Sequence, residues 1–109
     1  MKKFKVLEMA KMAAIETIEL TRKLNYESTE LRKQLIRSVT SVALNIAEAN
    51  GRKAKDRKYH FTVAYSSAKE SIVNLELLIM LGFICENKAK VCLSNLDQIC
   101  AMLYKLNSN

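Results

Sequence analysis

The 109-residue sequence contains no proline and only two glycines, Gly51 and Gly82. Strands need frequent turns, and turns depend on Gly, Pro, Asn and Asp. A chain with so few of these residues must therefore form few, long elements, which argues against a β-rich fold and predicts helices joined by short loops. The length corresponds to one domain, residues 1–109, with a small core that oligomerisation would help to stabilise.

Long hydrophobic runs are also missing, because no stretch approaches the ~20 apolar residues of a membrane-spanning helix. The N-terminal segment Met1–Lys5 is basic, but Glu8, Lys11 and Glu16 interrupt the continuous apolar region that a secretory signal would need. We therefore expect a cytoplasmic protein that does not associate with membranes.

Residues that usually catalyse reactions or bind metals are scarce. His60 is the only histidine, and Cys85, Cys92 and Cys100 lack the CxxC spacing of a zinc site. No Gly-rich phosphate loop and no paired-carboxylate motif is present. A nucleophile–base pair would have to combine a serine or cysteine with His60. We expect no catalytic activity, no cofactor and no bound metal, and we expect the three cysteines to be buried as small apolar side chains on one helix face.

What the sequence does contain is apolar residues at three- and four-residue spacing, which predicts four helices. Ser28, or the neighbouring Thr29, is a suitable N-cap for the second helix. Gly51 and Gly82 are expected to end the second and third helices in the left-handed conformation. The predicted fold is all-α, an up-down-up-down antiparallel four-helix bundle. Its helices are predicted at about 5–24, 29–50, 55–81 and 87–106.

The apolar residues also predict which side of each helix faces the core. In the third helix, the apolar residues Val63, Val73, Leu77 and Met80 lie off the main line, so this helix has apolar residues on two sides. We expect part of that surface to contact another subunit. The predicted inward lines are Leu7, Ala10, Ala14, Ile18 and Thr21, widened by Phe4 and Ile15, in the first helix; Leu31, Leu35, Val39, Val42 and Ile46 in the second; Phe61, Ala64, Ala68, Ile72, Leu75 and Leu78 or Ile79 in the third; and Ala89, Cys92, Leu96, Ile99, Leu103 and Leu106 in the fourth.

Positive charge is concentrated in one quarter of the chain. The formal net charge is +7, and the segment 32–58 carries +6 of it, because its eight basic residues face only two acids, Glu48 and Asp56. Such a concentration of positive charge is typical of a phosphate-binding surface. A surface that binds an acidic protein, or one that only contacts solvent, can have the same composition. The predicted nucleic-acid or partner-binding residues are Arg32, Lys33, Arg37, Arg52, Lys53, Lys55, Arg57 and Lys58.

Polar residues recur on the same face of the second helix as Arg37. Ser41 and Asn45 lie next to the apolar line, so we expect them to be half-buried and to need hydrogen-bond partners. Glu48 is one helical turn from Arg52 and can pair with it. We interpret Ser41, Asn45 and Glu48 as structural polar residues. Candidate partners on the third helix are Ser67, Glu70 and Asn74.

The run QLIRSVTSVALNIAEANGR, residues 34–52, resembles the signature of the four-helix-bundle proteins encoded in intervening sequences of bacterial 23S rRNA genes. That signature reads approximately QLRRA-x-x-S-I-P-x-N-I-A-E-G-x-G-R. Ala43 replaces the usual proline and Ala49 the usual glycine, so the second helix is expected to run without a kink. The match continues more weakly through Phe61, Ala64 and Glu70. The same family includes the accessory variability determinant of diversity-generating retroelements.

The resemblance implies a closed homo-oligomer, a pentameric barrel of bundles. Family members with a known role bind nucleic acid and a reverse transcriptase through a basic surface, and Arg37 and Arg52 are the matching positions here. The other six basic residues are our inference from the clustering of charge.

We therefore predict a non-catalytic, nucleic-acid-binding oligomer that is accessory to a reverse transcriptase or associated with rRNA. The sequence does not distinguish RNA from DNA. Two alternatives stay open: an adaptor that binds an acidic face of a protein partner, and a purely structural oligomer whose charge only confers solubility.

Overall fold

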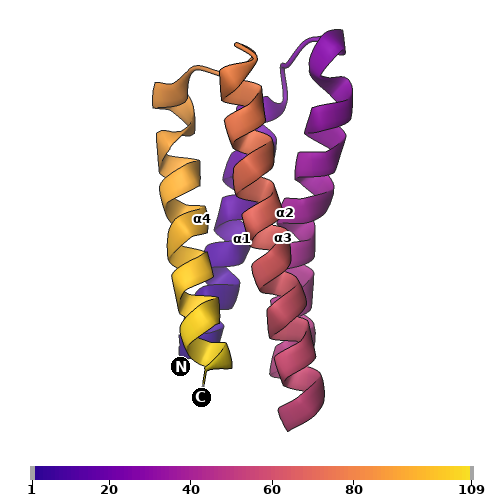
Figure 1. Cartoon of the computed structure of the whole chain (residues 1–109), viewed down its shortest axis with the longest axis vertical. Helices are drawn as coiled ribbons and strands as arrows, with labels where there is room; N and C mark the ends of the chain where they lie inside the picture. The colour runs from indigo at the N-terminus through magenta and orange to yellow at the C-terminus, as the bar shows by residue number, and fades with distance from the viewer. Residues whose placement is uncertain (1, 109) are drawn as a thin grey trace.

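The computed structural model describes residues 2–108, and over this range the chain forms four long α-helices and no strand. Successive helices run in opposite directions, and the two chain ends lie at the same end of the bundle (Figure 1). The all-α, four-helix prediction is therefore confirmed, in a bundle that measures 43 × 22 × 18 Å. The helices are α1 (Lys2–Thr21), α2 (Thr29–Asn50), α3 (Ala54–Met80) and α4 (Glu86–Asn107), and a short 3-10 helix, η1 (Tyr26–Ser28), precedes α2.

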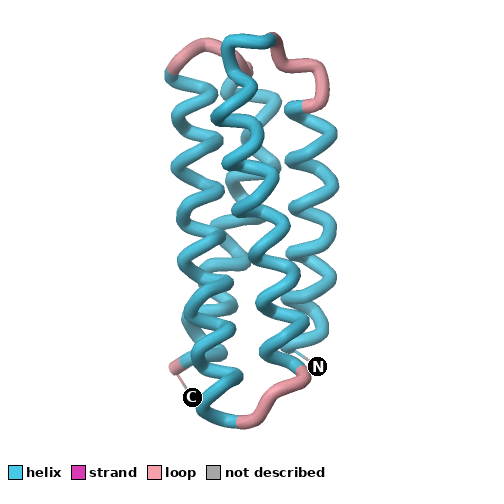
Figure 2. Tube along the Cα trace, turned by 90° about the vertical axis from the view of Figure 1, so that its right-hand side faces the viewer, coloured by secondary structure: helices cyan, strands magenta, loops and turns pink. Residues whose placement is uncertain are grey.

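Each long helix packs mainly against two others. α1 and α3 both contact α2 and α4, so the four helices surround one core, with short loops at the two ends (Figure 2). α2 continues unbroken through Ala43, as expected without the family's proline. In the described part of the chain, no helix combines the length and the apolar character needed to cross a membrane.

The end of α1 differs from the prediction. The helix ends at Thr21 instead of near residue 24, and it begins at Lys2 instead of near residue 5. The Thr21 carbonyl oxygen accepts a hydrogen bond from the Nε–H of Arg32 on α2, at 2.8 Å. The same carbonyl also accepts from the Leu24 backbone N–H at 3.2 Å. A turn and a cation thus both satisfy this carbonyl group at the C-terminus of α1.

Of the other residues predicted to begin or end helices, one behaves as expected and two do not. Gly82 ends α3 as predicted and has a φ of 83°. Gly51 directly follows α2, as predicted, but its φ is −95°, so the expected left-handed conformation is wrong at this position. Ser28 directly precedes α2, yet its hydroxyl donates to the Asn25 carbonyl oxygen at 2.8 Å and does not cap the helix.

The core consists largely of the predicted inward lines of α2, α3 and α4. Leu35, Ile46, Leu75, Leu96 and Leu103 are fully buried. Burial of such side chains is the main favourable contribution to folding, at roughly 1.5–3 kcal/mol each. The members of these lines that are only half-buried are Leu31, Ile72, Ile79 and Leu106.

The inward face of α1 is rotated relative to the prediction. Phe4 and Ile15, which were expected to widen the core line, are exposed. Two threonines of α1, Thr17 and Thr21, are buried. The hydroxyl of Thr21 has a hydrogen-bond partner within the same helix, because Oγ1 donates to the Thr17 carbonyl oxygen at 3.0 Å. The predicted residues Leu7, Ala14 and Ile18 are half-buried, and the fully buried residues of α1 are Val6, Ala10, Ala13, Thr17 and Thr21.

The cysteines do not all share one environment. Cys92 and Cys100 are buried on α4, as predicted, and burial raises the pKa of both thiols, which keeps them protonated and unreactive near neutral pH. Cys85 is exposed just before α4, so the prediction of three buried cysteines is wrong for this residue. Within residues 2–108, no group of three or more His, Cys, Asp or Glu side chains is placed to hold a metal ion.

Small polar side chains line the contact between α2 and α3. Ser38 Oγ lies 2.8 Å from Ser71 Oγ, and Ser41 Oγ lies 2.9 Å from Ser67 Oγ. We call these four residues the serine seam. The distance between packed helices depends on the side chains at their contact, so serines allow α2 and α3 to approach closely while the paired hydroxyls remain hydrogen-bonded.

The serine seam generates a prediction about stability. Ser71→Leu should lower the free energy of unfolding by about 1–3 kcal/mol, because an added isobutyl group cannot fit at a closely packed contact. Ser71→Ala should cost about 1 kcal/mol, since it removes one hydroxyl but keeps the small volume. Urea denaturation measures both. The matched control is Ser66→Leu on the exposed side of α3, and a cost there equal to that of Ser71→Leu would contradict the interpretation.

Candidate nucleic-acid interface

The fold gathers basic residues from three separate segments at one end of the bundle. The turn between α2 and α3 lies at the same end as the start of α1 and the end of α4 (Figure 1). Glu48 and Asp56 are the acids of the segment that surrounds this turn. We call this region the basic end, and its basic residues are Lys5, Arg52, Lys53, Lys55, Arg57, Lys58 and Lys105.

Most of the charge at the basic end is not neutralised within the chain. Arg52 pairs with Glu48, with Nε 3.0 Å from Oε2, which confirms the predicted contact between them. Among residues 2–108, no ion pair joins an acid to Lys53, Lys55, Arg57 or Lys58, and all four side chains are exposed. Their positive field is therefore available to a phosphate backbone.

Lys33 and Arg37 lie apart from the basic end. Arg37 and Arg52 are separated by about 22 Å along the helix axis, at 1.5 Å per residue, and α2 has no basic residue between them. Arg37 is 73% exposed, and its Nη2 lies 3.9 Å from Glu70 Oε2, which is too long for a strong contact. The predicted surface is thus divided into a group at the basic end and a smaller group on the other half of α2.

Arg32 has a structural contact. Its side chain is half-buried, and its Nε–H is bonded to the Thr21 carbonyl oxygen at the end of α1. This contact joins α1 to α2 and removes one of the donors of Arg32 from the predicted binding surface.

The polar residues of α2 face α3. Asn45 Nδ2 donates to the Ser41 carbonyl oxygen at 2.9 Å, which turns Asn45 Oδ1 toward His60 Nδ1 at 3.1 Å. Because an amide oxygen only accepts, His60 must donate from Nδ1. Of the expected partners on α3, Ser67 does contact Ser41. Glu70 lies near Arg37 instead, and Asn74 is buried farther along the helix, where its amide nitrogen has no hydrogen-bond partner among residues 2–108.

Sequence reasoning missed His60 as a partner, although a signal was present. In two antiparallel helices joined by a short turn, residues at equal distances from the turn face each other. Asn45 and His60 stand at comparable distances before and after the turn at 51–53. The rule therefore finds this contact once the turn is located. Ser67 lies farther from the turn than Ser41, so the rule does not find the contact between the two serines.

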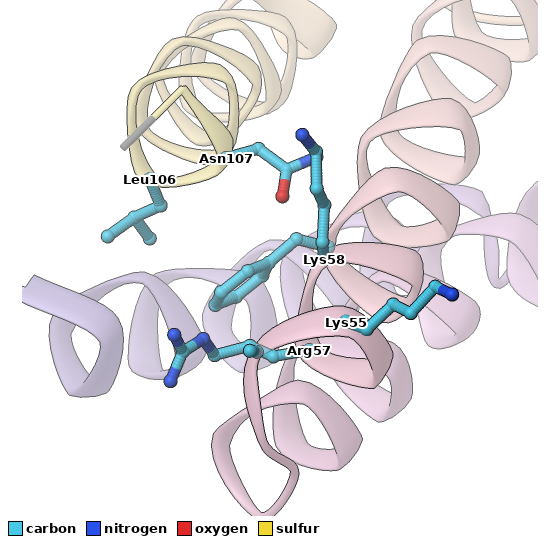
Figure 3. A pocket seen from close by; sticks show the side chains of 7 residues that line it. Lys55, Arg57, Lys58, Leu106 and Asn107 are labelled. Atoms are coloured by element: carbon cyan, nitrogen blue, oxygen red, sulfur yellow. The ribbon is translucent and has the colours of Figure 1, made fainter.

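A pocket of about 330 Å³ opens between the start of α3 and the end of α4 (Figure 3). Two helical regions that are distant in sequence form it, so the sequence alone did not indicate it. Figure 3 shows Lys58 rising beside Asn107, whereas Lys55 points away. The lining residues are Ala54, Lys55, Arg57, Lys58, Phe61, Leu106 and Asn107.

Hydrogen bonds fix one wall of this pocket. Asn107 Nδ2 donates to Thr62 Oγ1 at 2.8 Å, and Thr62 Oγ1 donates to the Lys58 carbonyl oxygen at 2.8 Å. The last turn of α4 is thereby attached to the third turn of α3, so this wall of the pocket is held in place.

Comparison with known proteins agrees with this fold. The sequence profile of the 23S rRNA-intervening sequence proteins matches residues 2–105. The structure is similar to that of a protein of unknown function from the S23 ribosomal protein family of Bacteroides thetaiotaomicron, with a TM-score of 0.91 and 26% sequence identity over 100% of both chains. No curated protein matches the sequence. Since the family profile covers nearly all of the chain, the protein belongs to the family of 23S rRNA-intervening sequence proteins.

Proposed function

We propose that this protein is a non-catalytic nucleic-acid-binding bundle whose basic end contacts phosphate groups. One observation carries the proposal: Lys53, Lys55, Arg57 and Lys58 are exposed together at one end of the molecule, and within residues 2–108 no acid pairs with them. Membership in a family encoded within rRNA genes supports association with RNA.

The form of this surface favours contacts to the backbone over reading of bases. Lysines and arginines spread around the end of a bundle can each meet a phosphate, but no single helix presents a row of base-reading side chains. Arg52 is partly neutralised by Glu48, so it should contribute less than its neighbours. Binding should therefore depend little on sequence and strongly on salt.

The environment of His60 supports a non-catalytic role. Its Nδ1–H is bonded to Asn45, and its ring meets that of Tyr59 edge-on, with centroids 5.2 Å apart. In the part of the chain that the structure describes, no serine or cysteine is hydrogen-bonded to this histidine. A nucleophile–base pair of the kind that hydrolases use is thus not assembled around it.

Binding to structured RNA and to DNA hairpins, measured by fluorescence anisotropy over a series of salt concentrations, tests this function. The double variant Lys53→Gln/Lys55→Gln should bind more weakly than the wild type and reduce the slope of log K against log salt by about 2, because two phosphate contacts are lost.

The matched control is Lys33→Gln/Arg37→Gln, which removes the same charge from the other half of α2. We expect this variant to retain most of the affinity and nearly the full salt slope. Equal losses in the two double variants would mean that net charge, and not the basic end, is responsible. Absence of binding at low salt would reject nucleic-acid binding altogether.

The bundle also exposes apolar side chains, which leads us to propose that it assembles as a closed homo-oligomer, a pentamer as the family resemblance implies. Val73, Leu77 and Met80 recur on one outward face of α3, continued by Leu81, and Met80 is 81% exposed. Apolar patches of this kind are usually covered by another protein surface. The exposed apolar residues of α1, which lies across the bundle from α3 and can meet the α3 face of a neighbouring copy, are Phe4, Met12 and Ile15.

Light scattering coupled to size-exclusion chromatography tests the assembly. We expect the wild type to elute as an oligomer, and Leu77→Lys/Met80→Lys to shift toward the 12.4 kDa monomer, because charges in an apolar contact are costly to desolvate. Val91→Lys on α4, where Val91 is also exposed, should leave the mass unchanged. A monomeric wild type at micromolar concentration would refute this part of the proposal.

A protein partner, such as the reverse transcriptase that the resemblance implies, would use the same positive surface. Affinity purification with and without nuclease treatment separates the two functions. Partners that are lost after nuclease support binding through nucleic acid, whereas an acidic protein that remains bound supports the adaptor function.

A further inference from the structure

The pocket at the basic end combines an apolar floor with a cationic rim. Ala54, Arg57, Lys58 and Phe61 follow the spacing i, i+3, i+4 and i+7, so they lie on one face of α3. Phe61 is only 4% exposed and forms part of the floor, together with Leu106 from α4. Arg57 and Lys58 are exposed at the rim.

No carboxylate among the described residues lines this pocket. Asp56 belongs to the same helical turn, but at about 100° per residue it lies on the opposite side of α3 from Lys58 and Ala54. Arg57 and Lys58 have neither an ion pair nor a side-chain hydrogen bond within residues 2–108. An anion in this pocket would therefore meet the side chains of Arg57 and Lys58, with Lys55 also on the lining, and no competing acid.

The first turn of α3 adds to the positive potential. Ala54, the first residue of α3, lines the pocket, and the side chain of Lys53, which precedes it, does not cap the helix. The backbone N–H groups of a first helical turn carry partial positive charge and favour a phosphate. Their partial charge adds to that of Arg57 and Lys58, and the combined potential favours a doubly charged phosphate over a singly charged one.

We propose that this pocket binds one nucleotide that carries a phosphate monoester, with the phosphate between Arg57 and Lys58 and the base or sugar against Phe61 and Leu106. This inference rests on the proposed function and specifies the group that one part of the basic end recognises. A volume of about 330 Å³ is near the lower limit of ligand pockets, so the pocket fits one nucleotide and not a run of strand. The nucleotide is free in solution or stands at the end of a strand.

Three single-stranded RNAs of one sequence provide the test: one with a 5′-phosphate, one with a 3′-phosphate and one without a terminal phosphate. Fluorescence anisotropy should show about tenfold tighter binding of at least one phosphorylated strand, since a charge-assisted contact to a monoester is absent from the third. Arg57→Gln and Lys58→Gln should each abolish most of this preference. Both residues are exposed, so the variants should fold, which circular dichroism checks.

Lys53→Gln is the matched control. It removes the same charge beside the first turn of α3, but the exposed Lys53 does not line the pocket, whereas Lys55 does. We expect it to weaken binding of all three strands by a similar factor and to leave the preference intact. Loss of the preference in Lys53→Gln to the same extent as in Arg57→Gln would overturn the pocket in favour of general charge attraction.

Competition with adenosine monophosphate and with adenosine distinguishes the two sources of the ligand. Displacement by the monophosphate but not by adenosine indicates a site for a free nucleotide, whereas a terminal-phosphate preference that the monophosphate does not displace indicates a site for a strand end. Both results support the pocket. Strong binding with equal affinity for the three strands would reject the pocket alone, and no binding of any strand would reject the proposed function with it.

Discussion

Close packing of α2 against α3 is the constraint on which the rest of the molecule depends. The serine seam keeps these two helices near each other, and the paired hydroxyls at 2.8 and 2.9 Å avoid the cost of burying unsatisfied polar groups. Because the helices are joined by only three residues, 51–53, their register relative to each other is fixed. The basic residues that follow the turn are therefore held at the end of the bundle, and Asn45 is held opposite His60.

This register also explains why the charge of the basic end remains unpaired. Near the turn, an acid on α2 reaches only residues at a similar distance from the turn, and Glu48 is already occupied by Arg52. Concentrated like charges repel one another and lower stability, an effect that exposure to water and salt reduces. A neutral turn would avoid this repulsion, so the charge does not contribute to the stability of the fold.

Periodicity predicted the four helices and the core lines of α2, α3 and α4, because Leu, Ile and Val at helical spacing have only one arrangement that buries them. It failed for α1, where Ala13 and Ala14 stand side by side and Val6 precedes Leu7. Two faces of α1, shifted by one residue along the sequence, are therefore almost equally apolar. Packing between α2 and α4 decides between them, and it selects the face that contains Val6, Ala13 and Thr17. A hydropathy pattern counts the hydroxyl of Thr17 against burial, whereas Ala10 and Thr21 are buried as predicted.

The candidate site shows the same division between local and tertiary information. Charge clustering identified Arg57 and Lys58, but Asn107 became part of the pocket only through the antiparallel course of α4. The fold also separates two kinds of surface: the basic end, and the apolar patch near the opposite end of α3. In a ring with cyclic symmetry, equivalent ends of all copies lie on the same side. Assembly through the apolar patch would therefore place every basic end on one face, where several weak phosphate contacts act together and the effective affinity rises.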